Sequence, residues 1–152
     1  MYQRILVPLD GSPLAETILP RAQALAKALN SELILLRVTL NPAAEFSFSD
    51  PILASNIIQE DEQESKTYIN SKYSQIEKEG VRVSYLLRQG PVAETIVEVA
   101  DLMLVDLIAM STHGRSGIKR WLLGSVADRV THISHVPVML LRPESSNESE
   151  KA

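Results

Sequence analysis

Short apolar runs alternate with helical patterns along this chain, and the alternation limits the fold more than any other feature. The runs that we interpret as strands are Ile5–Leu9, Leu33–Val38, Val81–Arg88, Leu104–Met110 and Val136–Leu141. The first, second and fourth are almost continuously apolar, which is typical of strands buried on both faces of a parallel sheet. The third alternates more and suits a place near a sheet edge.

Helices are expected between these runs, over residues 13–29, 56–79, 92–100 and 125–134. Ser12 is a good N-cap, Pro13 suits the first helical position, and Pro20 should kink the first helix or break one of its hydrogen bonds. Gly80 is a natural residue to follow the second helix. Residues 39–55 are irregular and read as a loop, which leaves two alternatives: a flap or a solvated insertion.

The order of these elements predicts a doubly wound α/β fold. Strands that alternate with helices form a parallel sheet with helices on both faces, connected by right-handed crossovers. We predict five strands in the order 3-2-1-4-5, in one domain of residues 1–142, followed by a disordered polar tail of residues 143–152.

Composition narrows the class of protein. The chain of 152 residues contains no cysteine, which excludes disulfides and thiolate chemistry and favours a cytoplasmic location. Its net charge of −4 argues against a nucleic-acid surface. No apolar run approaches the roughly 20 residues of a spanning helix, and no signal segment is evident, so we expect no membrane partner.

The loop from Met110 to Ser125 is rich in hydrogen-bond donors. It contains Gly114, Gly117 and Gly124, and glycine allows positive φ and close backbone approach, so consecutive N–H groups can point into one concavity. Its hydroxyl groups and the predicted helix start at Ser125 add further donors. The loop therefore suits an anion, phosphate above all, although a tight connection without a ligand is the alternative.

The predicted strand order brings this loop close to the turn after the first strand. Ligands of such sheets bind beyond the carboxyl ends of the strands, where the strand order reverses. Pro8, Leu9 and Asp10 leave strand one there, and Met110 and Ser111 leave strand four. Asp10 would then contact a ligand or cap its own turn. The chain has neither a P-loop motif nor the dinucleotide fingerprint. Flavin is not expected either, because flavodoxin-like proteins hold the phosphate in a loop after the first strand, whereas this loop follows the fourth.

Three segments resemble the universal stress protein family. They are Ile-Leu-Val-Pro-Leu-Asp-Gly-Ser near the start, Ser-Thr-His-Gly-Arg-Ser-Gly followed by Trp-Leu-Leu-Gly-Ser-Val, and Pro-Val-Met-Leu-Leu-Arg near the end. The likeness covers residues 3–142. It implies a five-stranded α/β fold, commonly dimeric through the last strand, and many members of this family bind ATP or another adenine nucleotide while others bind none.

The resemblance also assigns site residues. The family's ATP pattern is G-x-x-G, nine residues, then G-[S/T]; here Gly114 and Gly124-Ser125 match it, and Ser111 replaces the first glycine. The resemblance implies that Asp10 contacts the ribose or the adenine edge, that Pro8, Leu9 and Val38 frame the base, and that the motif holds the phosphates and ribose. The expected nucleotide-binding residues are Pro8, Leu9, Asp10, Val38, Met110, Ser111, His113, Gly114, Arg115, Gly117, Gly124, Ser125 and Val126.

Three functions stay open at this point. The first is a stress-response protein with an adenine nucleotide, ATP foremost, as a regulatory ligand, with Mg²⁺ on its phosphates. The second is a nucleotide-free dimeric interaction module in which Ser111 closes the pocket. The third is a slow ATPase, although no catalytic residue stands out. In each case Val138, Met139, Leu140 and Leu141 form a hydrophobic edge strand suited to a homodimer. No metal site is expected, since His132 and His135 lack further ligands.

Overall fold

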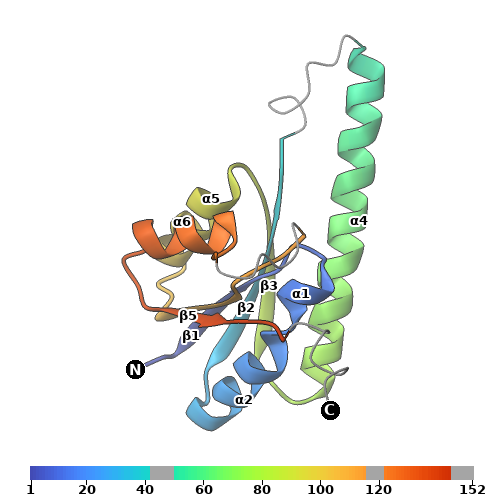
Figure 1. The fold of residues 1–152 in the computed structure, drawn as a ribbon. Helices are drawn as coiled ribbons and strands as arrows, with labels where there is room; N and C mark the ends of the chain where they lie inside the picture. The colour runs from blue at the N-terminus through green and yellow to red at the C-terminus, as the bar shows by residue number, and fades with distance from the viewer. Residues whose placement is uncertain (42–49, 116–121, 145–152) are drawn as a thin grey trace, which may run out of the picture.

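The sheet has the predicted topology. A computed structural model describes residues 1–41, 50–115 and 122–144. The five strands are β1 (Arg4–Pro8), β2 (Glu32–Thr39), β3 (Val83–Gln89), β4 (Leu107–Ser111) and β5 (Val138–Leu141). They lie in the order β3-β2-β1-β4-β5, and every pair is parallel. The predicted order and the doubly wound α/β class are therefore confirmed (Figure 1).

Helices cover both faces of the sheet (Figure 1). On one face lie α1 (Pro13–Glu16), α2 (Leu19–Leu29) and α4 (Pro51–Lys78), and on the other lie α5 (Val92–Leu102) and α6 (Ser125–Ile133). Alternate residues of each central strand point to opposite faces, so each apolar run contributes side chains to two hydrophobic cores. Val7 and Leu35 belong to the α1/α2/α4 core, whereas Leu6 and Leu36 belong to the α5/α6 core.

Proline divides the first predicted helix in two. Ser12 caps α1, with its side chain accepting a hydrogen bond from the N–H of Ala15, and Pro13 lies at the first turn as expected. The helix then stops, and α2 begins with Pro20 in its own first turn. Proline is tolerated there because first-turn N–H groups have no helical partner. The sequence predicted one helix over 13–29 with a kink or a lost hydrogen bond at Pro20, whereas the structure has two separate helices.

The start of α4 was predicted wrongly. The helix begins at Pro51, whereas the sequence reading placed residues up to 55 in a loop and began the helix at 56. Asp50 caps it by accepting hydrogen bonds from the N–H groups of Ile52 (2.9 Å) and Leu53 (3.4 Å). Aspartate followed by proline is a helix-start pattern, which accounts for the earlier beginning. Residues 42–49 of the predicted loop lie outside the described residues.

The strands near residues 104 and 136 are shorter than predicted. β4 begins at Leu107, because Leu104 adopts a left-handed conformation (φ 51°) that separates the end of α5 from the strand. β5 begins at Val138 and pairs with β4 alone, which places it at a sheet edge. Of the predicted tail of residues 143–152, the part after Glu144 lies outside the described residues.

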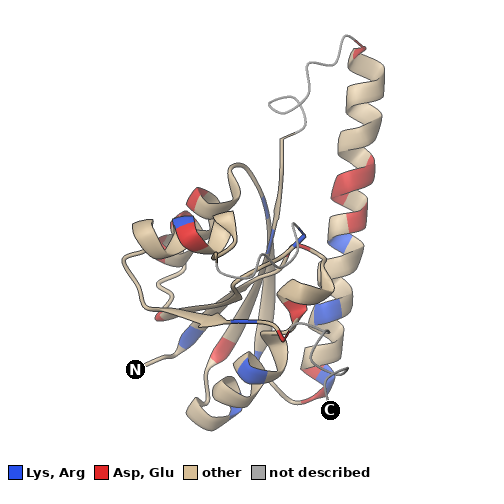
Figure 2. Cartoon of the chain, in the orientation of Figure 1, with Lys and Arg blue, Asp and Glu red and all other residues tan. Residues whose placement is uncertain are grey.

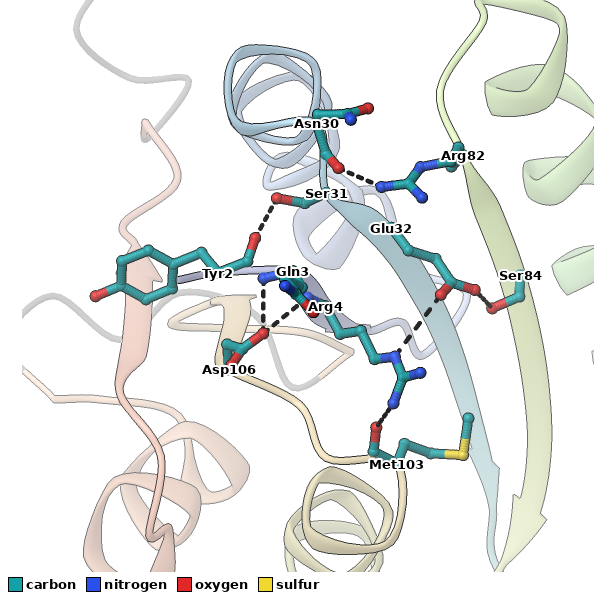
Figure 3. A network of polar contacts seen from close by, with 10 residues as sticks. All are labelled: Tyr2, Gln3, Arg4, Asn30, Ser31, Glu32, Arg82, Ser84, Met103 and Asp106. Carbon is teal, nitrogen blue, oxygen red and sulfur yellow. Dashed lines mark hydrogen bonds and ion pairs between the residues drawn. The ribbon is translucent and has the colours of Figure 1, made fainter.

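Polar contacts tie the strands together at the amino edge of the sheet (Figure 3). Asp106 Oδ2 accepts hydrogen bonds from the N–H groups of Gln3 (2.7 Å) and Arg4 (3.0 Å), so the entries of β1 and β4 are joined. Glu32 pairs with Arg4 at 3.9 Å and accepts a hydrogen bond from Ser84 Oγ at 2.8 Å. Internal contacts therefore join β1, β2, β3 and β4 at the amino edge of the sheet.

The helix α4 extends well past the carboxyl edge of the sheet (Figure 1). Its 28 residues correspond to about 42 Å of helix. Its buried residues, Ser65, Ile69 and Ile76, all lie in its carboxyl-terminal half. At the other end Ile52 is 74% exposed. The middle turns of α4 therefore stand beside the carboxyl ends of the strands, where they form one wall of the cavity described below.

In the part of the chain that the structure describes, no helix combines the length and the apolar character that crossing a bilayer requires.

Candidate functional site

A cavity of about 460 Å³ opens at the carboxyl edge of the sheet. It lies where β1 and β4 diverge, between the turn after β1 and the loop after β4, and α4, α5 and α6 contribute to its walls. Its volume falls within the roughly 300–1,000 Å³ of small-molecule sites. The cavity therefore lies at the place where doubly wound sheets hold their ligands.

Twelve of the thirteen predicted residues line this cavity. They are Pro8, Leu9, Asp10, Val38, Met110, Ser111, His113, Gly114, Arg115, Gly124, Ser125 and Val126. Gly117 lies outside the described residues. Segments that are about a hundred positions apart in the sequence thus meet around one hollow, because β1 and β4 are neighbours in the sheet.

Asp10 joins the two segments. Its Oδ1 accepts hydrogen bonds from the N–H (2.9 Å) and the hydroxyl (2.6 Å) of Ser12, and its Oδ2 accepts one from the N–H of Arg115 (2.9 Å). The sequence left two roles open for Asp10, a turn cap or a ligand contact. The structure shows that it caps the turn and also holds the glycine loop, while its position in the cavity wall keeps a carboxylate facing the ligand space.

These contacts keep Asp10 ionised at neutral pH. Burial raises the pKa of Asp10, but the hydrogen bonds from the side chain and backbone of Ser12, and then the N–H and positive charge of Arg115, outweigh it. The pKa therefore lies below its ordinary value of 3.8. An ionised carboxylate only accepts hydrogen bonds. It can therefore accept one from a hydroxyl group, such as that of a ribose.

The glycines of the loop are required for space. A Cβ on Gly114 would overlap the carboxylate of Asp10, and one on Gly124 would lie 2.6 Å from the carbonyl oxygen of Thr112. Neither residue has a positive φ, so the conformational freedom that glycine allows is not used at these two positions. The expected close backbone approach is confirmed, because a side chain at Gly114 would push the loop away from Asp10 and one at Gly124 would push it away from the Thr112 carbonyl.

Hydrogen bonds fix the beginning of the loop. His113 is buried, with Nδ1 2.8 Å from the Thr112 hydroxyl and Nε2 2.8 Å from the carbonyl oxygen of Leu122, so both ring nitrogens have partners within the chain. Ser111 Oγ accepts a hydrogen bond from the N–H of His113 at 3.3 Å. Ser111 is 5% exposed and lies in the cavity wall, and the cavity is open with this side chain in place.

The start of α6 lines the cavity, and no described side chain caps its first turn, although the N–H of Gly124 itself donates to the carbonyl oxygen of Thr112 at 2.8 Å. Gly124, Ser125, Val126 and Ala127 all line it, and the N-cap Gly124 offers no side chain to the first-turn N–H groups. Ser12 and Asp50, in contrast, cap α1 and α4. Uncapped N–H groups together with the positive end of the helix dipole attract anions. The first turn of α6 therefore attracts anions at the cavity wall, as does the start of α5 at Val92, which has no capping side chain either.

The rest of the wall is largely apolar. Leu9, Val38, Leu40 and Ile57 lie on the side of β1, β2 and α4, and a further group lies on the side of β4 and α5. That group consists of Val92, Ile96 and Met110. An apolar slot beside an anion-attracting loop suits a ligand with a flat ring at one end and negative charge at the other.

Two charged residues of the cavity were not predicted. Arg37 lies in β2 and is only 6% exposed, and Asp61 comes from α4. Acidic residues gather in the middle turns of this helix (Figure 2). The signal for Arg37 was in the sequence, since it is the one charged residue inside the apolar run Leu33–Val38. Asp61 carried no such signal, because it lies within a polar helical stretch.

Metal ligands do not gather around the cavity in the described ranges. No group of three histidine, aspartate or glutamate side chains there has the arrangement of a metal site. His132 and His135 contact separate carboxylates, those of Asp128 and Asp101, and His135 lies beyond the end of α6. The described residues of the cavity wall offer hydrogen-bonding groups and charged side chains to a ligand.

The sheet and its cavity define a doubly wound α/β protein with a cavity at the reversal of strand order. The model of the universal stress protein family matches residues 1–142. The chain belongs to the universal stress protein family.

Relatives match over nearly the whole chain. The universal stress protein MJ0531 of Methanocaldococcus jannaschii is 33% identical over 147 residues, which cover 93% of this chain and 83% of that protein. MJ0577 of the same organism is 32% identical, with 96% and 98% covered. The solved structure of MJ0577 has a TM-score of 0.85 at 29% identity and covers 96% of this chain and 99% of that one.

A solved structure of a universal stress protein in complex with cAMP is also similar. It has a TM-score of 0.61 at 26% identity, and 94% of this chain and 98% of that chain are covered.

Proposed function

We propose that this protein binds an adenine nucleotide, ATP foremost, in the cavity at the carboxyl edge of the sheet. The nucleotide acts as a regulatory ligand that orders the loop after β4 and thereby changes which partners the protein contacts. Phosphate-dependent ordering of a loop is an established form of switching in proteins.

The junction between Asp10 and the glycine loop is the observation that carries the proposal. Asp10 holds the loop at the N–H of Arg115, while Gly114 and Gly124 leave room for backbone to approach closely. The start of α6, which no described side chain caps, lines the same cavity. A phosphate group bound there receives several backbone N–H donors at once.

The other parts of a nucleotide fit the remaining wall. An adenine ring suits the apolar slot beside Val38 and Leu9, and ribose hydroxyls suit the ionised carboxylate of Asp10. The relative that was solved in complex with cAMP supports an adenine nucleotide as the class of ligand. Mg²⁺ would bind through the phosphates.

Two measurements on the purified protein test the proposal. The protein is heat-denatured, and the small molecules released are identified by mass spectrometry. The ligand-free protein is then titrated with ATP, ADP, AMP and cyclic AMP in a calorimeter. We expect a co-purified adenine nucleotide or a dissociation constant below the millimolar range for at least one of the four. Absence of both would remove the proposal.

The edge strand β5 supports a homodimer in addition. Val138, Met139, Leu140 and Leu141 are all only half-buried, and the strand pairs with β4 on one side alone. An apolar unpaired edge is protected when two copies meet across a two-fold axis. Light scattering at micromolar concentration should give twice the monomer mass, and a monomer mass would contradict the dimer.

A further inference from the structure

Arg37 is an unusual side chain in the cavity wall. It lies in the middle of the buried strand β2, with Leu36 before it and Val38 after it, and it is 6% exposed. Within the described part of the chain its Nε atom has no hydrogen-bond partner. Buried guanidinium groups in proteins are normally paired, and Arg37 lines the cavity, so an anion bound there would supply a partner that the described residues do not.

The nearby carboxylates do not neutralise Arg37. Asp10 uses both of its oxygens on Ser12 and Arg115, and no ion pair joins either Asp10 or Asp61 to Arg37 in the described ranges. Burial and then the charge of Arg115 lower the pKa of Arg37, while Asp10 and Asp61 act in the opposite direction. The guanidinium remains charged, because arginine does not lose its proton in proteins.

A second cation lies near this one. The side chain of Arg115 reaches over the turn after β1, where its Nη2 would be 3.4 Å from a Cβ on Gly11. Arg37 and Arg115 repel each other electrostatically. Two like charges that share one cavity become favourable when an anion lies between them, and guanidinium groups match phosphate oxygens in geometry.

We propose that Arg37 is an anion-binding residue of the cavity and donates hydrogen bonds from its guanidinium group to a phosphate oxygen of the bound nucleotide. This inference rests on the proposed function. Arg37 and the start of α6 belong to elements on either side of β1, so the ligand's phosphates are held from two directions. A neutral nucleoside leaves the guanidinium uncompensated, and the cavity therefore selects for phosphorylated ligands.

Titration with ligands that differ only in charge tests the inference. ATP, AMP and adenosine are titrated against the wild-type protein, Arg37→Met, Arg37→Lys and Arg88→Met. Arg88 is the matched control, because it is exposed on the neighbouring strand β3 and does not line the cavity. We expect Arg37→Met to lose about ten- to hundredfold in affinity for AMP and ATP and less than about twofold for adenosine.

The other variants complete the pattern. Arg37→Lys should retain part of the affinity because it keeps the charge without the planar donor group, and Arg88→Met should match the wild type. An equal loss for all three ligands in Arg37→Met would overturn the inference, since it would place the contact on the base or ribose. Unchanged affinities in Arg37→Met would overturn it as well.

A spectroscopic measurement on the wild-type protein removes any dependence on whether the variants fold. The Nε–H signal of Arg37 in an NMR spectrum should shift on addition of AMP or pyrophosphate and stay in place with adenosine. If the protein binds no nucleotide, the proposed function fails, and the pyrophosphate shift alone then decides whether Arg37 binds anions. An Nε–H signal that is unmoved by both anions overturns the inference.

Discussion

The carboxylate of Asp10, in the turn after β1, accepts a hydrogen bond from the N–H of Arg115, in the loop after β4, at 2.9 Å. These residues are 105 positions apart in the sequence. The bond fixes the distance between the two segments that form the cavity. Binding and stability should therefore both respond to changes at this point.

Asp10→Asn tests the junction directly. An amide accepts weaker hydrogen bonds than a carboxylate, so we expect a loss of about 1–2 kcal/mol in unfolding free energy and at least a tenfold loss in nucleotide affinity. Asp106→Asn is the matched control, since Asp106 also accepts two backbone hydrogen bonds but lies at the opposite edge of the sheet. Chemical denaturation and calorimetry measure both quantities. The account is contradicted if Asp106→Asn reduces affinity as much as Asp10→Asn.

The stability difference between wild type and Asp10→Asn should depend on pH. The pKa of Asp10 is lowered in the folded protein, so its ionised form stabilises the fold above the ordinary value of 3.8, and this contribution disappears as the pH falls through the folded value. We expect the difference in unfolding free energy to be constant from pH 5 to 7 and to shrink below about pH 4. A difference that grows toward acid would show the opposite sign and refute the assignment.

Gly114→Ala should reduce both nucleotide affinity and stability, and comparison with Gly80→Ala separates the two effects. A methyl group at this position overlaps the Asp10 carboxylate, so the loop has to move away, and we expect at least a tenfold loss of affinity with about 1–3 kcal/mol of destabilisation. Gly80→Ala is a suitable comparison, because Gly80 has a φ of 79° and lies far from the cavity, with open space around it. It should cost about 1–2 kcal/mol through backbone strain alone and leave affinity unchanged. Equal effects of both variants on affinity would argue against the overlap.

Ser111→Gly tests whether serine at the first motif position closes the site. The Ser111 hydroxyl is occupied by the N–H of His113, and the cavity is open beside it. We therefore expect wild type and variant to bind ATP with affinities within about fivefold of each other, the loss of one hydrogen bond being the main change. ATP binding by the variant alone would favour the nucleotide-free interaction module.

The strand order and the cavity could be predicted because they depend on patterns that span the chain. Buried runs such as Leu33–Val38 indicate central strands, and the predicted order 3-2-1-4-5 rests on the usual doubly wound arrangement, which the structure has. The start of α4 was missed because Asp50-Pro51 was interpreted as loop chemistry, although the same pair serves as a helix cap. Leu104 was missed because its apolar character conceals a left-handed turn.

Side-chain partners could not be predicted in the same way. That Gly114 is needed for space and not for positive φ depends on where the Asp10 carboxylate lies, which only the packed structure defines. The lack of a partner for Arg37 likewise depends on the final positions of Asp10 and Asp61.

Mapping the ligand on the wild-type protein by NMR tests the central claim most directly. ATP is added to ¹⁵N-labelled protein, and the backbone amide signals are followed. We predict that the largest shifts fall on Gly114, Arg115, Gly124, Ser125 and Val126. Spectra that are unchanged at millimolar ATP, or shifts confined to residues away from the cavity, would contradict the account.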